Sequence, residues 1–388
     1  MSRRTNPPNP KRSATRWVGA MFLAGTLVAL LAAGLMLLLS EDSGSPLPPA
    51  AKNLSTLNLI YLRAYLRFNY DSLNTPSARS DGIFEVQEGE TAADICARLK
   101  TEGWVGDSDL VCSYLHYTGG DRSIGSGMFL IHAGQNPRQI ADSLTTGESK
   151  IRQLTVFAGW RQEEIADALP TAGIPITPND FLTAAGGRPN GDGGLAALYA
   201  EIPDWATLEG FLYPAEYRVV PGETADQIVQ RMALSFKQSL PAGWQAAVES
   251  RGLSVYQAVT LASIIQREAM LEEEMPLIGS VYFNRLSQQM RLEADPTVQY
   301  ALGFQAERGG WWTNPLWSAD FGVDSPYNTY LYYGLPPGPI CNPGSAALQA
   351  VSEPAQTSYL FFRAACDGSG RHNFAETYIQ HLANACGG

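Results

Sequence analysis

The first forty residues hold one long apolar run between two charged stretches. The twenty-three residues from Trp17 to Leu39 include no charged side chain, and Glu41 and Asp42 follow almost at once. At about 1.5 Å per residue, a helix of this length spans about 35 Å, enough for a hydrocarbon core about 30 Å thick. The run therefore predicts a transmembrane helix over 17–39. A cleavable signal peptide, the alternative, typically has an apolar region of only about 7–15 residues.

Beyond this run, short apolar alternations, glycine turns and amphipathic stretches form a recurring cycle of strand, turn and helix. The cycle occurs four times, over 83–100, 128–144, 154–169 and 217–232. Units of this size cannot bury a face alone, so we expect them to pack together. The cycle resembles the LysM fold, a small glycan-binding module, and indicates a LysM-like module over 83–150 and a connecting α+β region over 151–250. Ordinary α+β packing without sugar contact is the alternative.

The segment between the apolar run and the first cycle, 40–82, is predicted to be a juxtamembrane linker. Its first part, 41–52, is rich in Ser, Pro and Gly, as linkers commonly are. The stretch NLIYLRAYLRFNY that follows fits either a helix or a pair of strands. A glycine-rich stretch farther along, 184–196, is expected to be an exposed loop.

Charge separates the two sides of the predicted span. Residues 1–16 carry five basic side chains and no acidic one, whereas the whole chain has a net charge of −11. Basic residues before the span place the tail 1–16 in the cytoplasm, which makes the chain a single-pass protein of the cell membrane with 40–388 outside. The acidic remainder argues against a nucleic-acid partner, because phosphate backbones need a basic face.

Five cysteines outside the membrane suit an oxidising compartment, although five is an odd number. Cys96 and Cys112 are close enough in sequence to staple one small module, and Cys366 and Cys386 could pair near the C-terminus. Cys341 would then be free. No catalytic signature surrounds any of the five.

The strongest chemical signal lies near 254–272. Ser254 and Gln257 form a capping-box pattern that opens a helix. An apolar stripe at i+3 and i+4 spacing then leads to Glu268 and continues to Glu272. A carboxylate on an apolar stripe loses solvation, which raises its pKa and suits a general acid. A purely structural Glu268, tied to Arg285 or Arg291, is the equally weighted alternative.

Downstream of this helix, aromatic side chains are interleaved with hydroxyl, amide and carboxylate groups, as a sugar-binding groove requires. The candidate substrate-binding residues are Asn284, Glu293, Asp295, Tyr327, Asn328 and Tyr330. Asp295 also fits a cap of the turn before Pro296. His372 and His381 lack a third ligand at convincing spacing, so no metal site and no cofactor is expected.

These residues lie within a set of motifs that resembles the endolytic murein transglycosylases, the MltG/YceG-like family. The matching runs are LASIIQRE, VYFNRL, MRLEADPTVQY, SPYNTYLYYGLPPGPICNPG, RHNF and, upstream, EGFLYPAEY. The resemblance covers most of 83–381 and implies an α+β fold with a YceG-like catalytic domain over 251–388. The family's catalytic acid falls on Glu268. Gln266 stands where the family often has a second Glu, Glu293 where Gln is common, and Ala215–Glu216 where Asp–Thr is common.

The resemblance implies a lytic transglycosylase that cleaves the β-1,4 bond between N-acetylmuramic acid (MurNAc) and N-acetylglucosamine (GlcNAc) within peptidoglycan strands. The products would carry 1,6-anhydro-MurNAc ends. It also implies action on nascent strands beside peptidoglycan synthases. Two alternatives remain open: a peptidoglycan hydrolase with Glu293 or Asp295 as a second carboxylate, and a non-catalytic peptidoglycan-binding scaffold.

Overall fold

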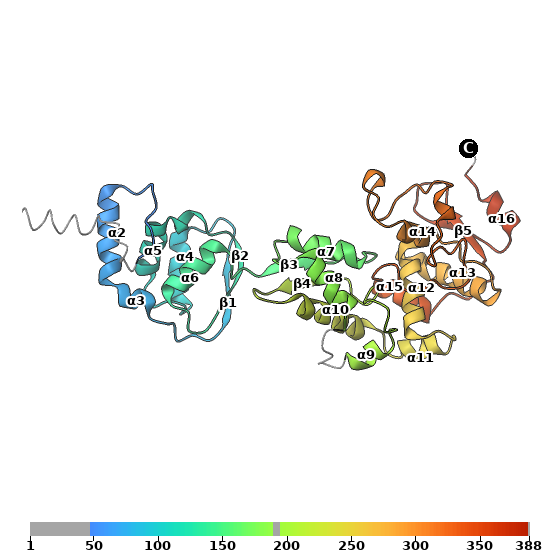
Figure 1. Ribbon diagram of the computed structural model, residues 1–388, viewed down its shortest axis with the longest axis horizontal. Coiled ribbons are helices and arrows are strands. Elements are labelled where there is room, and N and C mark those ends of the chain that lie inside the picture. Colours follow the sequence, from blue (N-terminus) through green and yellow to red (C-terminus); the bar gives the residue numbers. More distant parts are fainter. Residues whose placement is uncertain (1–46, 189–194, 387–388) are drawn as a thin grey trace, which may run out of the picture. The chain divides into compact units, whose positions relative to one another are not determined.

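The computed structural model describes residues 47–188 and 195–386, which form two compact units (Figure 1). The first unit ends at Ile151 and the second begins at Arg152; we refer to them as the N-terminal unit and the C-terminal unit. The predicted span 17–39 and tail 1–16 lie outside the described residues. Among those that are described, no helix combines the length and apolar character needed to cross a membrane.

The N-terminal unit pairs two of the predicted cycles into one sheet. Strands β1 and β2 are antiparallel, with Gly82 opposite Ile131 and Val86 opposite Gly127. The helices between and after them bury one apolar face each, so the unit has its own core. A single strand–turn–helix cycle is therefore not a module; two consecutive cycles form one sheet. The elements of this unit are α2 (Thr56–Phe68), α3 (Tyr70–Asn74), β1 (Gly82–Val86), α4 (Ala92–Thr101), α5 (Ser108–Thr118), a 3-10 turn η1 (Gly120–Arg122), β2 (Gly127–Ile131) and α6 (Pro137–Thr146).

The described part of the predicted linker, residues 47–82, contains two helices, which corrects the prediction for that part. The stretch that fitted either a helix or strands is α2, and α3 follows it directly. Leu62, Leu66 and Leu73 of these helices are buried in the core of the N-terminal unit. Apolar spacing at i+4 explains the outcome, since it places Leu62 and Leu66 on one helix face.

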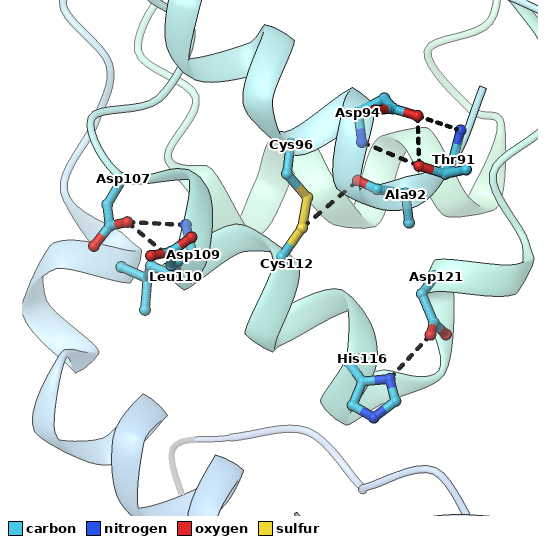
Figure 2. Close-up of a disulfide and its surroundings, with 10 residues drawn as sticks. All are labelled: Thr91, Ala92, Asp94, Cys96, Asp107, Asp109, Leu110, Cys112, His116 and Asp121. Carbon is cyan, nitrogen blue, oxygen red and sulfur yellow. Dashed lines mark hydrogen bonds and ion pairs between the residues drawn. A yellow bond between two sulfur atoms is a disulfide. The ribbon is translucent and has the colours of Figure 1, made fainter.

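A disulfide joins α4 and α5, as predicted for Cys96 and Cys112 (Figure 2). Each helix starts at a side-chain cap: Thr91 and Asp94 form a capping box on α4, and Asp107 caps α5. These caps supply acceptors for backbone N–H groups that have no partner within the helix. The caps fix where the two helices begin, and the disulfide fixes how they pair.

The C-terminal unit starts with a strand pair that, like β1 and β2, is separated along the chain by helices. Strands β3 and β4 are antiparallel, with Arg152 opposite Val219, and they come from the third and fourth predicted cycles. The elements of this unit are β3 (Arg152–Thr155), α7 (Gln162–Thr171), α8 (Pro178–Gly186), α9 (Ala196–Ala200), β4 (Glu216–Val219), α10 (Ala225–Ser239), α11 (Trp244–Glu249), α12 (Val255–Glu268), η2 (Glu272–Glu274), α13 (Met275–Ser287), α14 (Asp295–Leu302), η3 (Ala306–Arg308), η4 (Asp320–Gly322), α15 (Ser345–Ser352), β5 (Phe361–Ala364), β6 (His372–Ala375) and α16 (Tyr378–Ala383).

Helix α12 lies at the centre of this unit and contacts α11, α13, α14 and α15 (Figure 1). Every residue from Val255 to Ile265 is buried except Gln257, so the helix is apolar on nearly all sides. A helix of that kind must be enclosed by other elements. Gly279 allows α13 to pack closely on α15, because a Cβ there would approach the Ala350 carbonyl oxygen to 3.0 Å.

The end of the chain folds back over α13. Strands β5 and β6 form an antiparallel pair in which Phe361 lies opposite Ala375. The predicted disulfide between Cys366 and Cys386 closes this region. Cys341 is free, also as predicted, and it is buried. Together with the helical core, the three strand pairs make a mixed α+β protein, in agreement with the predicted fold class.

Candidate active site

Helix α12 places Glu268 at its C-terminal end. The predicted capping box is present: the Ser254 hydroxyl accepts from the Gln257 N–H, and the Gln257 side chain accepts from the Ser254 N–H. The helix ends at Glu268 because Ala269 takes an extended conformation. The predicted stripe therefore stops there, and Glu272 belongs to the separate turn η2. Glu268 is consequently the last side chain carried by a buried helix, and it is half-buried.

The surroundings of Glu268 favour its protonated form. Burial raises the pKa of the carboxyl to about 7, and the negative charge of Asp295 acts in the same direction. The hydroxyl of Tyr282, on α13, donates to Glu268 Oε1 at 2.9 Å and lowers the pKa, but burial has the larger effect. A carboxyl with a pKa near neutrality can both give and take a proton, as a general acid–base requires.

The structural alternative for Glu268 required an arginine partner. Arg285 instead donates to the Leu360, Arg291 and Leu292 carbonyl oxygens and pairs with Glu293 at 3.2 Å. Arg291 lies over the Tyr333 ring. Within the described residues, neither arginine forms an ion pair with Glu268. In the part of the chain that the structure describes, the carboxyl thus has one hydrogen-bond donor, Tyr282, which bonds Oε1.

Asp295 and Tyr330 both lie close enough to Glu268 to interact with it electrostatically. The Tyr330 hydroxyl donates to Asp295 Oδ1 at 2.6 Å. Burial raises the pKa of Tyr330, and the bond to Asp295 and the charges of Asp295 and Glu268 act in the same direction. The interpretation of Asp295 as a turn cap is wrong: Ala294 is the N-cap residue of α14, and no side chain caps it.

Glu293 is exposed and salt-bridged. It has a positive φ of 49°, and its N–H donates to the Thr329 carbonyl oxygen. Its side chain pairs with Arg285, which leaves it less available than Asp295 as a second carboxylate. Glu268, Tyr282, Asp295 and Tyr330, with the Glu293–Arg285 pair beside them, form what we call the Glu268 cluster.

Two predicted substrate-binding amides are structural instead. Asn328 is completely buried, and it donates to the Phe321 and Val323 carbonyl oxygens while accepting from the Tyr330 N–H. Asn284 donates both amide protons, to the carbonyl oxygens of Thr357 and Tyr359. The bonds of Asn328 are made within the protein, so Asn328 orients Tyr330, whereas the half-buried Asn284 uses both of its amide protons on the backbone.

Tyr327 belongs to a second cluster, which sequence reasoning missed. The centres of the Tyr327 and Tyr300 rings lie 4.7 Å apart. Burial raises the pKa of both phenols, and the charge of Glu209 acts in the same direction. Glu209 is buried, and burial raises its pKa to about 8. Its carboxylate accepts from the Gln162 N–H and the Asn342 amide. The only sequence signal was an acid at the start of the apolar run EGFLYPAEY.

Asn342 ties Glu209 to the helical core. Its side chain is fully buried; the amide donates to Glu209 and to the Trp160 carbonyl oxygen, and its oxygen accepts from the N–H groups of Gly210 and Leu212. Gly210 has a φ of +88°, and a Cβ there would collide with Pro339. The Asn342 side chain therefore joins three segments that are distant in sequence: its own turn, Trp160 and residues 209–212.

Neither histidine of the C-terminal region contributes to the Glu268 cluster. His372 pairs with the buried Glu274 at 2.8 Å. Burial lowers the pKa of His381, which lies against Phe361 and Tyr378. Across 47–188 and 195–386, no group of three or more His, Cys, Asp or Glu side chains is arranged to hold a metal ion.

Comparison with known proteins supplies independent evidence. A model of the YceG-like family matches residues 84–386. The endolytic murein transglycosylase of Bacillus subtilis is 28% identical over 308 residues, covering 76% of this chain and 81% of the relative. The enzyme of the same name from Streptococcus pneumoniae is 29% identical over 155 residues, or 40% of this chain, and the match spans only 28% of that longer protein.

A solved structure shares the fold as well. The crystal structure of a YceG-like protein from Listeria monocytogenes superposes with a TM-score of 0.55 and is 28% identical; the match covers 78% of this chain and 98% of that one. The family match extends over both units and includes every residue of the Glu268 cluster. The chain therefore belongs to the YceG-like family.

Proposed function

We propose that this protein is a lytic transglycosylase that cleaves the MurNAc–GlcNAc β-1,4 bond within peptidoglycan strands. The observation that carries the proposal is the half-buried Glu268 carboxyl, whose pKa is raised to about 7 and whose only hydrogen-bond donor among the described residues is Tyr282. The names of the relatives support the same reaction, since both are endolytic murein transglycosylases.

In this mechanism one carboxyl does two tasks. Protonated Glu268 donates its proton to the glycosidic oxygen as the bond from that oxygen to C1 of MurNAc breaks. The resulting carboxylate then accepts the proton of the MurNAc C6 hydroxyl while the C6 oxygen bonds to C1. The Tyr282 hydroxyl stabilises the carboxylate between the two steps. The product has a 1,6-anhydro end, no water is consumed, and Glu268 returns to its protonated form.

Replacement of the proton donor tests this proposal. We expect Glu268→Gln to lower the rate by about 10²–10⁴-fold, the usual contribution of general acid–base catalysis. Release of anhydro-muropeptides from isolated sacculi, measured by chromatography and mass spectrometry, is the assay. Turnover by Glu268→Gln equal to that of the unaltered protein would instead favour the non-catalytic scaffold.

A two-carboxylate hydrolase is the second candidate, and the position of Asp295 favours it. Its charge is close enough to Glu268 to raise the pKa of that carboxyl. Reaction in ¹⁸O-labelled water separates the two mechanisms. A hydrolase places one labelled oxygen on each new reducing MurNAc end, whereas the proposed enzyme yields unlabelled anhydro ends.

The location of the enzyme is also a proposal. The apolar run 17–39 after a basic tail supports a single transmembrane anchor with the catalytic unit outside the cell membrane. An anchored enzyme would meet strands as the peptidoglycan synthases extend them and would end their growth. Extraction of membranes with alkaline carbonate tests the anchor: the intact chain should stay in the pellet, and a chain that starts at residue 41 should not.

The N-terminal unit is proposed to bind glycan as a LysM-like module over 83–150. The joined strand–helix–helix–strand order of β1, α4, α5 and β2 supports this role. Binding of chito-oligosaccharides to residues 41–151 alone is the test, and heat-denatured protein is the control. If residues 41–151 do not bind the oligosaccharide, the proposal that this unit binds glycan is wrong.

A further inference from the structure

The residue before Glu268 has no role in the mechanism above. Arg267 is half-buried on α12, and burial lowers the pKa of its guanidinium. The Nε–H is fully buried and has no hydrogen-bond partner. Within the described residues, no carboxylate forms an ion pair with this side chain. A buried donor without a partner is rare in proteins and calls for an explanation.

Its neighbours hold the guanidinium in place without neutralising it. The charged group lies 3.8 Å from the centre of the Trp312 ring. On another side it contacts Gly159, where a Cβ would approach Nη1 to 3.2 Å. Trp312 is itself fixed by a hydrogen bond of 2.9 Å from its Nε1–H to Glu164. The Trp312 ring and the Gly159 backbone thus hold the Arg267 guanidinium in place without using its N–H donors.

The nearby acidic groups are already engaged. Glu164 accepts from the Arg161 N–H at 2.9 Å as well as from Trp312, and Glu163 pairs with Arg161 at 3.2 Å. The charge of Glu164 raises the pKa of Arg267, but among the described residues neither glutamate forms an ion pair with Arg267. The buried Nε–H is out of reach of a ligand, but the terminal Nη1 and Nη2 groups are not among the buried atoms, and they form a planar pair of donors of the kind that arginine uses for carboxylates.

The substrate of the proposed function carries such a group close to its reacting carbon, and Arg267 directly precedes Glu268 at the end of α12. The lactyl ether of MurNAc is attached to C3 of the ring whose C1 reacts at Glu268. Its carboxyl is free in strands without stem peptides, and in peptide-bearing strands the free carboxylates lie on the stem. We propose that Arg267 binds a carboxylate of the muramyl unit and so places C1 of that sugar at Glu268. This inference rests on the proposed function.

Binding in the Glu268→Gln background tests the site apart from turnover. Three ligands are used: uncross-linked peptide-bearing strands, the same strands after an amidase has removed the stems, and uncharged chito-oligosaccharides. We expect a second change, Arg267→Gln, to weaken binding of a muramyl ligand by about tenfold or more, since hydrogen bonds to charged groups are strong. Chito-oligosaccharide binding should change less than twofold.

The two muramyl ligands identify the source of the carboxylate. Loss confined to peptide-bearing strands assigns the stem peptide, loss confined to stripped strands assigns the lactyl group, and loss on both assigns a carboxylate that either form presents. The affinity of Arg267→Lys for a muramyl ligand should lie between that of Arg267→Gln and that of the unaltered arginine, because lysine keeps the charge and loses the paired geometry. Equal weakening on the uncharged oligosaccharide, or no weakening on either strand, overturns the proposal.

Arg308 provides a matched control. Its guanidinium lies 3.7 Å from the Trp317 ring centre, in the same kind of stack, but it pairs with Asp320 at 2.7 Å. Arg308→Gln should leave all three affinities unchanged. With Glu268 intact, Arg267→Gln should raise KM about tenfold and change kcat less than twofold, which a merely structural stack would not do. Full activity of Glu268→Gln would reject the proposed catalytic residue separately from these affinities.

Discussion

At the scale of single residues, three neighbours act on the Glu268 carboxyl. The Tyr282 hydroxyl and the Arg285 charge stabilise the carboxylate, and the Asp295 charge destabilises it. Burial exceeds each of these effects, so the pKa lies near 7 instead of near 4.5. Activity that starts from the protonated acid should therefore decline as the pH rises through about 7.

Removal of the Tyr282 hydroxyl should move this decline to higher pH. Tyr282→Phe keeps the buried ring and deletes the donor, so the pKa of Glu268 rises. The basic limb of the kcat/KM profile is the measurement. Tyr332→Phe is the control, because that exposed hydroxyl bonds Asp324. An unchanged limb in Tyr282→Phe would mean that the titrating acid is another group.

Removal of the Asp295 charge should move the basic limb of the kcat/KM profile to lower pH. Asp295→Asn takes away a negative charge that raises the pKa of Glu268, so the decline should begin at lower pH. We expect product formation to continue with anhydro ends. A complete loss of activity with normal folding would identify Asp295 as the second carboxylate of a hydrolase.

At the scale of elements, the active-site helix depends on one turn that joins distant segments. Ser263 of α12 accepts from the Ile340 N–H at 3.0 Å, and Asn342 lies two residues farther on. The side chain of Asn342 then bonds the loops before α7 and β4. The position of α12 relative to the β3–β4 pair is thus held by buried hydrogen bonds as well as by apolar packing.

Asn342→Ala should destabilise this arrangement severely. The change leaves buried N–H groups of Gly210 and Leu212 without an acceptor, and each such group costs about 1–3 kcal/mol. We expect a loss of about 3–5 kcal/mol in the free energy of unfolding by urea. Asn373→Ala, on an exposed site in β6, should change it by less than about 0.5 kcal/mol. A similar small effect at Asn342 would show that the loops find other acceptors.

At the scale of the whole molecule, buried carboxyls link stability to pH. The pKa of Glu209 is about 8 in the folded chain against an ordinary 4.5, so the native state keeps a proton that the unfolded chain has released. Stability from this group is fully present below pH 4.5 and declines as the pH rises to about 8. Glu268 adds to the same trend up to about pH 7.

Glu209→Gln should reduce that slope. Loss of one titrating group removes about 1.4 kcal/mol per pH unit from the dependence between pH 5 and 8. Urea unfolding at several pH values, followed by hydrogen exchange of peptides from each unit, is the measurement. The effect should be confined to peptides of the C-terminal unit, and the exposed Glu353→Gln should leave it intact. A slope unchanged in Glu209→Gln would show that Glu209 is ionised in the native state.

Local signals were sufficient for the four strand–helix cycles and for α12. The capping pattern at Ser254 and the apolar spacing after it act within one or two turns, so the sequence reveals where α12 begins. The apolar helix made Glu268 a candidate acid, and the family resemblance favoured that role over a structural one. The cysteine pairs were predicted from proximity along the chain.

Tertiary structure decided what depends on distant partners. The sequence by itself determined the four strand–helix cycles, the helix that begins after Ser254 and Glu268 as a candidate acid, because each rests on neighbours along the chain. Only the folded chain joined the four cycles into two strand pairs, turned Asn328 and Asn284 inward and Asp295 toward Tyr330, and buried Glu209 under Asn342. Burial and hydrogen-bond partners are properties of contacts between segments far apart in sequence, and no local pattern records them.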